Sequence, residues 1–242
     1  KQEEDNVGVE RINEIEFRNV SFVYGDTGVK ALNNISFRIK RGESLAVIGR
    51  TGSGKSTIAH LICRLYDTNE GSILVNGIDI KKIDLHDFRS KTGYIPQDVF
   101  LFSDTIANNI AFSIAEDKVD MDEVENAARQ AAIHSNIIDF PQQYKTVVGE
   151  RGITLSGGQK QRISIARAII KKPQLLIFDD CLSAVDTETE EEILSNLKPA
   201  SENMLSIIIS HRISSVKNAG QIIVLEDGKL MEKGAHHELL AK

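Results

Sequence analysis

Short apolar runs alternate with amphipathic segments along most of this 242-residue chain. Residues 44–48 (SLAVI), 175–179 (LLIFD) and 205–209 (LSIII) are apolar almost throughout, and short runs of this kind are typical of strands buried on both faces. Residues 55–65 and 159–170 place apolar side chains at helical spacing. Strands that alternate with helices predict a core built on a parallel sheet.

A different pattern near both ends predicts antiparallel pairs. Residues 15–24 and 31–39 alternate between apolar and polar positions and are rich in β-branched side chains, which favours strands. Residues 71–80 contain Asn76-Gly77, a strong signal for a tight hairpin turn. Residues 221–232 show a second hairpin pattern. We therefore expect an antiparallel N-terminal subdomain beside the parallel core.

The middle of the chain lacks strand signals. Residues 105–140 are rich in helical patterns, including one predicted helix over 121–134 (MDEVENAARQAAIH). We expect a helical subdomain of about 100–172 that interrupts the core. The predicted fold class is therefore α/β, with an N-terminal antiparallel β-subdomain and an inserted α-helical subdomain.

Composition and charge narrow the possible functions. The net charge of −6 disfavours a broad surface for nucleic acid, so no nucleic-acid partner is expected. Two cysteines, Cys63 and Cys181, are too few for a disulfide scaffold or a metal knuckle, and a reduced setting fits best. No run of 18 apolar residues is present, so neither a transmembrane helix nor a secretory signal is expected.

The first motif with a clear chemistry is a glycine-rich loop between a predicted strand and a predicted helix. Residues 49–56 (GRTGSGKS) match the pattern G-x-x-x-x-G-K-[ST], in which backbone N–H groups surround a phosphate. Lys55 is expected to reach the β- and γ-phosphates and the Ser56 hydroxyl to bind Mg²⁺. The alternative is a glycine-rich turn without a ligand. The residues expected to contact the nucleotide here are Arg50, Thr51, Gly52, Ser53, Gly54, Lys55, Ser56 and Thr57.

Two carboxylates follow the apolar run 175–178. A buried parallel strand would carry Asp179 and Asp180 to its C-terminal edge, where ligands bind in α/β folds. We expect Asp179 to hold Mg²⁺ through water and Asp180 to face the water that attacks the phosphate. The alternative is a strand-end aspartate that caps the next loop.

The sequence of a second loop indicates a protein family. Residues 155–159 (LSGGQ) precede the helix predicted at 159–170, and donors at a helix N-terminus make a second anion site. Together with the glycine loop, this signature resembles the ATP-binding cassette (ABC) family from about Ile15 to Lys242. The resemblance implies a P-loop NTPase (RecA-like) core, with ATP and Mg²⁺ as ligands. It also implies that the signature residues Ser156, Gly157, Gly158 and Gln159 serve the nucleotide of a second ABC domain.

Other positions match the family in order. The resemblance implies that Tyr24 stacks on adenine and that Gln97 contacts Mg²⁺ and the membrane-domain interface. It also implies that Gln97 is a catalytic residue, together with Lys55, Asp180 and His211. It also implies that Asp186, in the loop 183–186 (SAVD), faces the second subunit, and that His211 contacts the γ-phosphate. The residues alone leave simpler alternatives open: a strand-end aromatic for Tyr24, a polar loop residue for Gln97 and a structural histidine for His211.

Two further stretches resemble exporter-type cassettes, residues 104–110 (DTIANNI) and 146–152 (TVVGERG). In that subclass the segment containing Glu150 and Arg151 touches helices of the membrane domain. The polar residues 1–14 are then expected to be a linker from a preceding membrane domain. The expected partners are ATP and ADP, a second ATP-binding domain (homo- or heterodimer) and a transmembrane domain. The expected location is the cytoplasmic face of the cell (inner) membrane.

One residue departs from the family pattern. The family usually has glutamate after the magnesium aspartate, but this chain has Asp180, which is one methylene shorter. We expect normal ATP binding and slow hydrolysis at this chain's own site. The function that the resemblance implies is ATP hydrolysis by an exporter-type ABC domain that powers transport across a membrane. The alternative is a mainly regulatory ATP-binding half of a heterodimeric exporter, although the retained His211 argues against it. A soluble cassette ATPase of DNA repair or translation is a third, weaker alternative.

Overall fold

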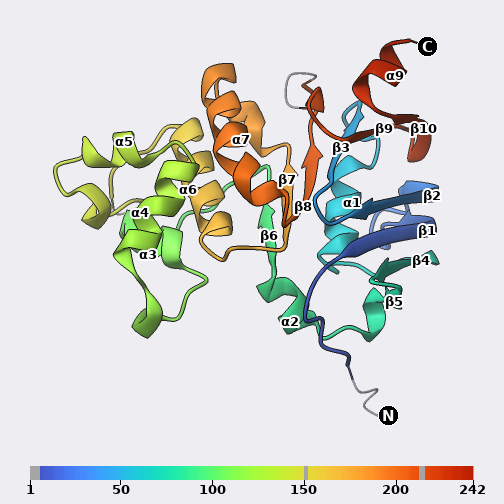
Figure 1. Cartoon of the computed structure of the whole chain (residues 1–242), viewed down its shortest axis with the longest axis horizontal. Helices are drawn as coiled ribbons and strands as arrows, with labels where there is room; N and C mark the ends of the chain where they lie inside the picture. The colour runs from blue at the N-terminus through green and yellow to red at the C-terminus, as the bar shows by residue number, and fades with distance from the viewer. Residues whose placement is uncertain (1–5, 150–151, 213–215, 242) are drawn as a thin grey trace. The chain divides into compact units, whose positions relative to one another are not determined.

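The computed structural model describes residues 6–149, 152–212 and 216–241, and it divides into two compact units (Figure 1). The first unit contains the residues up to Tyr94, then Gln174–Asp180 and the residues from Ser201 onward. The second unit contains Ile95–Pro173 and Cys181–Ala200. Each unit is described by itself.

The first unit begins with an antiparallel sheet in the order β2-β1-β4-β5. Asn76 and Gly77 both have positive φ, 53° and 82°, which is the geometry of a tight hairpin turn between β4 and β5. The predicted N-terminal antiparallel subdomain and its turn are therefore confirmed. The strands are β1 (Glu14–Val23), β2 (Lys30–Lys40), β4 (Glu70–Val75) and β5 (Ile78–Asp79).

A second sheet of the first unit has the order β10-β9-β3-β8-β7-β6. The pairs β9–β3, β3–β8 and β8–β7 are parallel, whereas β9 and β10 form an antiparallel hairpin. Every residue of β7 and β8 is buried, as their continuous apolar sequences predict. The strands are β3 (Ser44–Gly49), β6 (Thr92–Ile95), β7 (Leu175–Asp179), β8 (Leu205–Ile209), β9 (Gln221–Glu226) and β10 (Lys229–Gly234).

The apolar core of the first unit is shared by the two sheets and by α1. Phe17 of β1 stacks on Phe37 of β2 with 4.4 Å between ring centroids. Cys63, the C-cap of α1, belongs to the same core. Among the described residues, the helices of this unit include α1 (Lys55–Ile62), α2 (Leu85–Ser90) and α9 (His236–Leu240), with a 3-10 turn η1 at Ile80–Lys82.

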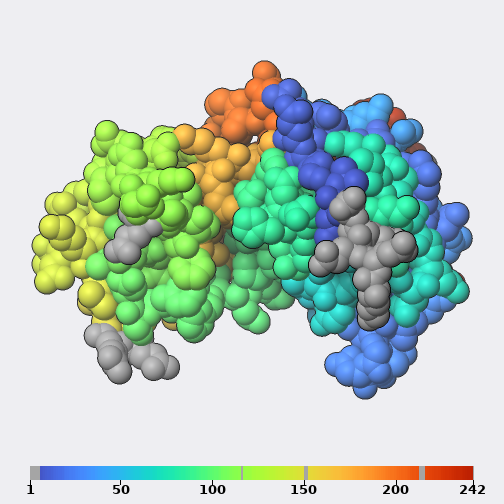
Figure 2. Space-filling model, turned by 90° about the horizontal axis from the view of Figure 1, so that it is seen from below, coloured from blue at the N-terminus to red at the C-terminus, as the bar shows by residue number. Residues whose placement is uncertain are grey.

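The described part of the expected linker packs on the first unit. Val7 pairs with Ile83, and the Val9 N–H donates to the Asp87 carboxylate at 2.7 Å. Figure 2 shows this dark-blue segment running over the teal surface around α2. Ile12 is completely buried.

The second unit consists mainly of helices, and Thr105 and Val147 pair there as an isolated bridge. Helix α4 ends at Gln130, earlier than predicted, because Ala132 adopts φ 53°. A separate helix, α5, begins at His134. The elements are α3 (Ile106–Ala111), η2 (Glu116–Lys118), α4 (Met121–Gln130), α5 (His134–Ile138), η3 (Gln143–Lys145), α6 (Gly157–Ile169), η4 (Cys181–Ala184) and α7 (Thr187–Ser201).

Candidate functional site

The glycine loop joins β3 to α1, as the motif requires. Gly54 has φ 97° and is the N-cap of α1, so no side chain occupies the first N–H groups of the helix. A Cβ on Gly54 would lie 2.2 Å from the Ala31 carbonyl oxygen. By contrast, a Cβ on Gly52 would meet nothing within 4 Å. The loop is therefore pressed against β2 on one side and open on the other, which is how a phosphate cradle is built.

Lys55 holds the loop in its present shape. Its Nζ donates to the carbonyl oxygens of Gly49 and Arg50, each at 2.9 Å. Partial burial lowers the pKa of Lys55, while the charges of Asp180 and Asp179 act in the opposite direction. The ammonium group thus lies across the loop, where it can exchange a carbonyl partner for a phosphate oxygen.

Ser56 and Asp179 meet at the strand edge, as the sequence predicts. Asp179 is the last residue of β7 and is 3% exposed. Its Oδ1 accepts a hydrogen bond from the Ser56 hydroxyl at 2.7 Å, and its Oδ2 accepts one from the Tyr94 hydroxyl at 3.0 Å. A hydroxyl and a carboxylate in contact are oxygen ligands of the kind that Mg²⁺ takes, usually together with phosphate oxygens and water.

Asp180 and His211 form a pair beyond the ends of β7 and β8. The His211 Nδ1 lies 3.0 and 3.1 Å from the two carboxylate oxygens of Asp180. The Asp180 N–H donates to the Ile209 carbonyl oxygen at 2.9 Å, and its φ is 50°. Aspartate tolerates this left-handed conformation better than most residues. Asp180 is largely buried, whereas His211 is half exposed.

Tyr24 lies beside the first turn of α1. Its hydroxyl is 3.1 Å from the Thr57 Oγ1 and 3.4 Å from the His60 Nδ1. The ring makes edge contacts with Phe22 and Tyr66 at centroid distances of 4.9 and 5.3 Å. Thr57 is buried and serves this contact.

The buried hydroxyl of Ser53 gives a further sign of a ligand. Ser53 is 4% exposed, and its Oγ has no hydrogen-bond partner among the described residues. Buried polar groups are normally paired, so an orphaned hydroxyl within the loop fits a site that an anion completes.

The remaining predicted residues lie in the second unit. The Gln97 carbonyl oxygen accepts a hydrogen bond from the Gln161 Nε2 at 3.1 Å. Asp186 accepts hydrogen bonds from the N–H and hydroxyl of Thr189 at 2.9 and 2.8 Å, and these bonds lower its pKa. It therefore caps the start of α7. Glu150 and Arg151 lie outside the described residues.

The signature loop begins α6 with a capping box. The Gln159 N–H donates to the Ser156 Oγ at 3.2 Å, and the Ser156 N–H donates to the Gln159 Oε1 at 2.9 Å. A Cβ on Gly157 would meet nothing within 4 Å, so the backbone at this helix start is open to an approaching ligand. A Cβ on Gly158 would lie 3.0 Å from the Ala184 carbonyl oxygen.

The capping role of Ser156 makes a testable prediction. Ser156→Ala removes the acceptor for the Gln159 N–H, so the free energy of unfolding should fall by about 1 kcal/mol without any nucleotide present. Urea denaturation followed by circular dichroism measures this change. The control is Ser113→Ala, which removes a hydroxyl from an exposed turn and should change stability by less than about 0.5 kcal/mol. Equal stability of the two variants would contradict the capping role.

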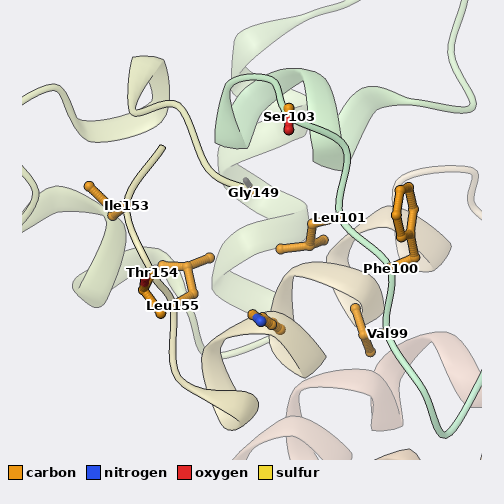
Figure 3. Close-up of a pocket in the computed structure, with 9 residues that line it drawn as sticks. Val99, Phe100, Leu101, Ser103, Gly149, Ile153, Thr154 and Leu155 are labelled. Carbon is orange, nitrogen blue, oxygen red and sulfur yellow. The ribbon is translucent and has the colours of Figure 1, made fainter. Parts of the chain in front are cut away.

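A hollow lies beside the signature loop in the second unit (Figure 3). Its volume is about 510 Å³, and its walls come from the segment after Gln97 and the segment that leads into α6. Phe100, which is exposed, stands at one wall and Leu155 at the other. The lining residues are Val99, Phe100, Leu101, Ser103, Gly149, Ile153, Thr154, Leu155 and Lys160.

Sequence reasoning missed two residues that contact the predicted site. Tyr94 bonds Asp179 across two strands that are neighbours in the sheet but about 80 positions apart in sequence. The Gln161 side chain, on α6, donates to the Gln97 carbonyl oxygen, 64 positions away in sequence. The signal for Tyr94 was its place near the end of a strand that leads into Gln97; no local pattern singled out Gln161.

Comparisons with known proteins show the family to which the chain is similar. The family model described as "ABC transporter" matches residues 32–183. The chain is 47% identical over 96% of its length to ATP-binding cassette sub-family B member 6 of Xenopus tropicalis, of which it covers 27%. It is 44% identical over 94% of its length to the ATP-dependent lipid A-core flippase of Escherichia coli (strain K12), of which it covers 39%.

A solved structure is similar over the whole chain. It is titled "Structure of a bacterial Atm1-family ABC exporter with ATP bound", and the TM-score is 0.91 at 42% identity. The match covers 100% of this chain and 41% of that one. The chain thus spans about two fifths or less of the exporters that it matches.

Proposed function

Since the chain belongs to the ABC transporter family, as an ATP-binding domain of exporter type, we propose that it hydrolyses ATP to drive export across a membrane. The observation that carries this proposal is the convergence of the loop lysine, Ser56, Asp179, Asp180 and His211 at one edge of the parallel sheet. Phosphoryl transfer depends on positioning and charge stabilisation, which these groups supply.

We propose the following roles for the residues of the site. The loop N–H groups and Lys55 bind the phosphates, and Tyr24 contacts the adenine. Ser56 and Asp179 would hold Mg²⁺. When bound, the cation neutralises charge on the β- and γ-phosphate oxygens. Asp180 orients the attacking water or accepts its proton, and His211 holds the Asp180 carboxylate in place and contacts the γ-phosphate.

The signature loop is proposed to act on a second copy or on a related chain. Ser156, Gly157, Gly158 and Gln159 open α6 with an accessible backbone, suited to the γ-phosphate of a nucleotide bound to the partner. Two such domains would enclose two ATP molecules head to tail, with Asp186 near the partner. The cycle of closure on ATP and opening after hydrolysis moves the membrane domains.

The hollow of the second unit is the proposed binding site for a helix of the transmembrane domain. It lies between the segment that follows Gln97 and the segment that leads into the signature loop, so a helix seated there touches both. We propose that the chain lies at the cytoplasmic face of the membrane. Among the described residues, no helix of the chain itself has the length and apolar character needed to cross a bilayer.

Asp180 favours a second candidate function. Its short carboxylate suits a site that holds ATP and hydrolyses it slowly, as in the regulatory half of a heterodimeric exporter. In that case the hydrolytic glutamate lies on the partner, next to this chain's signature loop.

One experiment tests the proposed function. The purified chain is titrated with ATP and Mg²⁺ by calorimetry, and its mass is followed by light scattering. We expect one nucleotide per chain and a doubling of mass with ATP but not with ADP. Absence of ATP binding would refute the proposal, whereas binding without a change of mass would favour a partner that differs from this chain.

A further inference from the structure

Tyr94 stands next to the proposed magnesium site without belonging to any motif of the sequence. It lies near the end of β6, the neighbour of β7 in the parallel sheet. Its hydroxyl donates to the Oδ2 of Asp179 at 3.0 Å, while Ser56 donates to the Oδ1 at 2.7 Å. Each oxygen of this carboxylate therefore has its own hydroxyl donor, one from the loop helix and one from the neighbouring strand.

The ring of Tyr94 is fixed independently of this hydrogen bond. It packs against the core of the first unit and is half buried. Its edge meets the ring of His60 on α1, with 6.5 Å between centroids. The hydroxyl therefore has little freedom to follow a carboxylate that turns away, so the aspartate adapts to the tyrosine.

Asp179 needs such an anchor because of its surroundings. It is 3% exposed, so water can solvate its charge only poorly and protein donors must do so. Removal of one donor would leave the carboxylate free to turn about its last bond. Mg²⁺ demands near-ideal octahedral geometry, so a turned carboxylate would bind it less well.

We propose that Tyr94 is a positioning residue for the magnesium site. Its hydroxyl fixes the plane of the Asp179 carboxylate and so presents the Oδ1 toward Ser56 and the metal. The proposal rests on the proposed function, because it assumes that Asp179 holds Mg²⁺ beside a bound nucleotide. In this proposal Tyr94 acts through Asp179 and is not itself a ligand of the metal. Partners of metal ligands typically contribute 10–100-fold to metal affinity.

The test is Tyr94→Phe, which keeps the ring and its contact with His60 and removes only the hydroxyl. Binding of a non-hydrolysable ATP analogue to the purified chain is measured by calorimetry over a series of Mg²⁺ concentrations and in EDTA. We expect the Mg²⁺ concentration for half-maximal enhancement of binding to rise about 10-fold. Binding in EDTA should change less than about twofold, because the loop and the adenine contacts are untouched.

Two further variants sharpen the interpretation. Tyr144→Phe removes the hydroxyl of a buried tyrosine, which lies 2.7 Å from the His134 Nδ1 in the second unit, and it should leave the Mg²⁺ dependence unchanged. In an Asp179→Asn background, the addition of Tyr94→Phe should have less than about a twofold effect, because the two residues act on one site.

Three results would overturn the proposal. They are an unchanged Mg²⁺ dependence in Tyr94→Phe, an equal loss of binding in EDTA, and an undiminished effect in the Asp179→Asn background. If the unmodified chain fails to bind the analogue with Mg²⁺, the proposed function falls and this proposal with it. If the unmodified chain binds the analogue with Mg²⁺ but Tyr94→Phe has the same Mg²⁺ dependence, the proposed function stands and Tyr94 has no positioning role.

Discussion

Replacement of Asp180 by glutamate is expected to raise the rate of ATP hydrolysis at this chain's own phosphate loop by about 100-fold. Asp180 is anchored on both sides, by its N–H to Ile209 and by its carboxylate to the His211 Nδ1 at 3.0 Å. Its reach toward a water above the loop is therefore limited. Glutamate extends the carboxylate by one carbon–carbon bond, roughly 1.5 Å. A displacement of about this size is worth two orders of magnitude in rate.

Single-turnover hydrolysis in the assembled transporter measures this effect, with ATP bound at this site. The matched control is Asp26→Glu, the same lengthening on an exposed turn, which should leave the rate unchanged. Asp180→Asn should not accelerate hydrolysis, because an amide cannot accept the proton. Glutamate fits φ 50° less well than aspartate, so the variant should be slightly less stable, and this does not affect the comparison of rates. An unchanged or lower rate in Asp180→Glu would contradict the hypothesis that the shorter side chain of Asp180 limits hydrolysis.

Gly54→Ala is expected to lower the affinity for ATP by at least about 100-fold, because several charge-assisted hydrogen bonds of about 1.5–3 kcal/mol each depend on the loop. The residue has φ 97°, and a Cβ there would lie 2.2 Å from the Ala31 carbonyl oxygen. The collision can be relieved only if the backbone of the loop or of β2 moves. The N–H groups at the start of α1 would then no longer converge on a phosphate.

Calorimetric titration of the purified chain with ATP measures this loss. Gly77→Ala is the matched control, because Gly77 also has a positive φ, 82°, yet a Cβ there would meet nothing within 4 Å. The control carries the backbone strain without the collision, and it should bind ATP as the unmodified chain does. Comparable loss in both variants would assign the effect to general destabilisation rather than to the loop.

Much of the fold was predictable because local and long-range signals agree in this chain. The buried strands β7 and β8 have continuous apolar sequences, and the Asn76-Gly77 turn has one favoured geometry. The apposition of Ser56 and Asp179 also follows from topology, since parallel strands deliver their ends to one edge.

The helix ends and contacts that the sequence did not predict have local physical causes. The break between α4 and α5 depends on Ala132 at φ 53°, a conformation for which alanine gives no sequence signal. Helix α1 ends at Ile62 rather than near residue 65 because Arg64 is also left-handed, with φ 49°. Helix α6 starts ahead of the predicted Gln159 because the capping box places Ser156 at its N-cap. The contacts of Tyr94 and Gln161 join distant segments, which periodicity cannot reveal.

The phosphate loop depends on a segment that the ribosome makes much later. Strand β3, which leads into the loop, pairs with β9, and the Gly228 N–H in the β9–β10 turn donates to the Ser53 carbonyl oxygen at 3.2 Å. At typical synthesis rates, the interval between these positions takes roughly 10–35 s. During that time the loop lacks both its neighbouring strand and this contact. A nucleotide therefore meets an incomplete loop on the nascent chain, and we expect ATP binding to stabilise the domain fully only after β9 has docked.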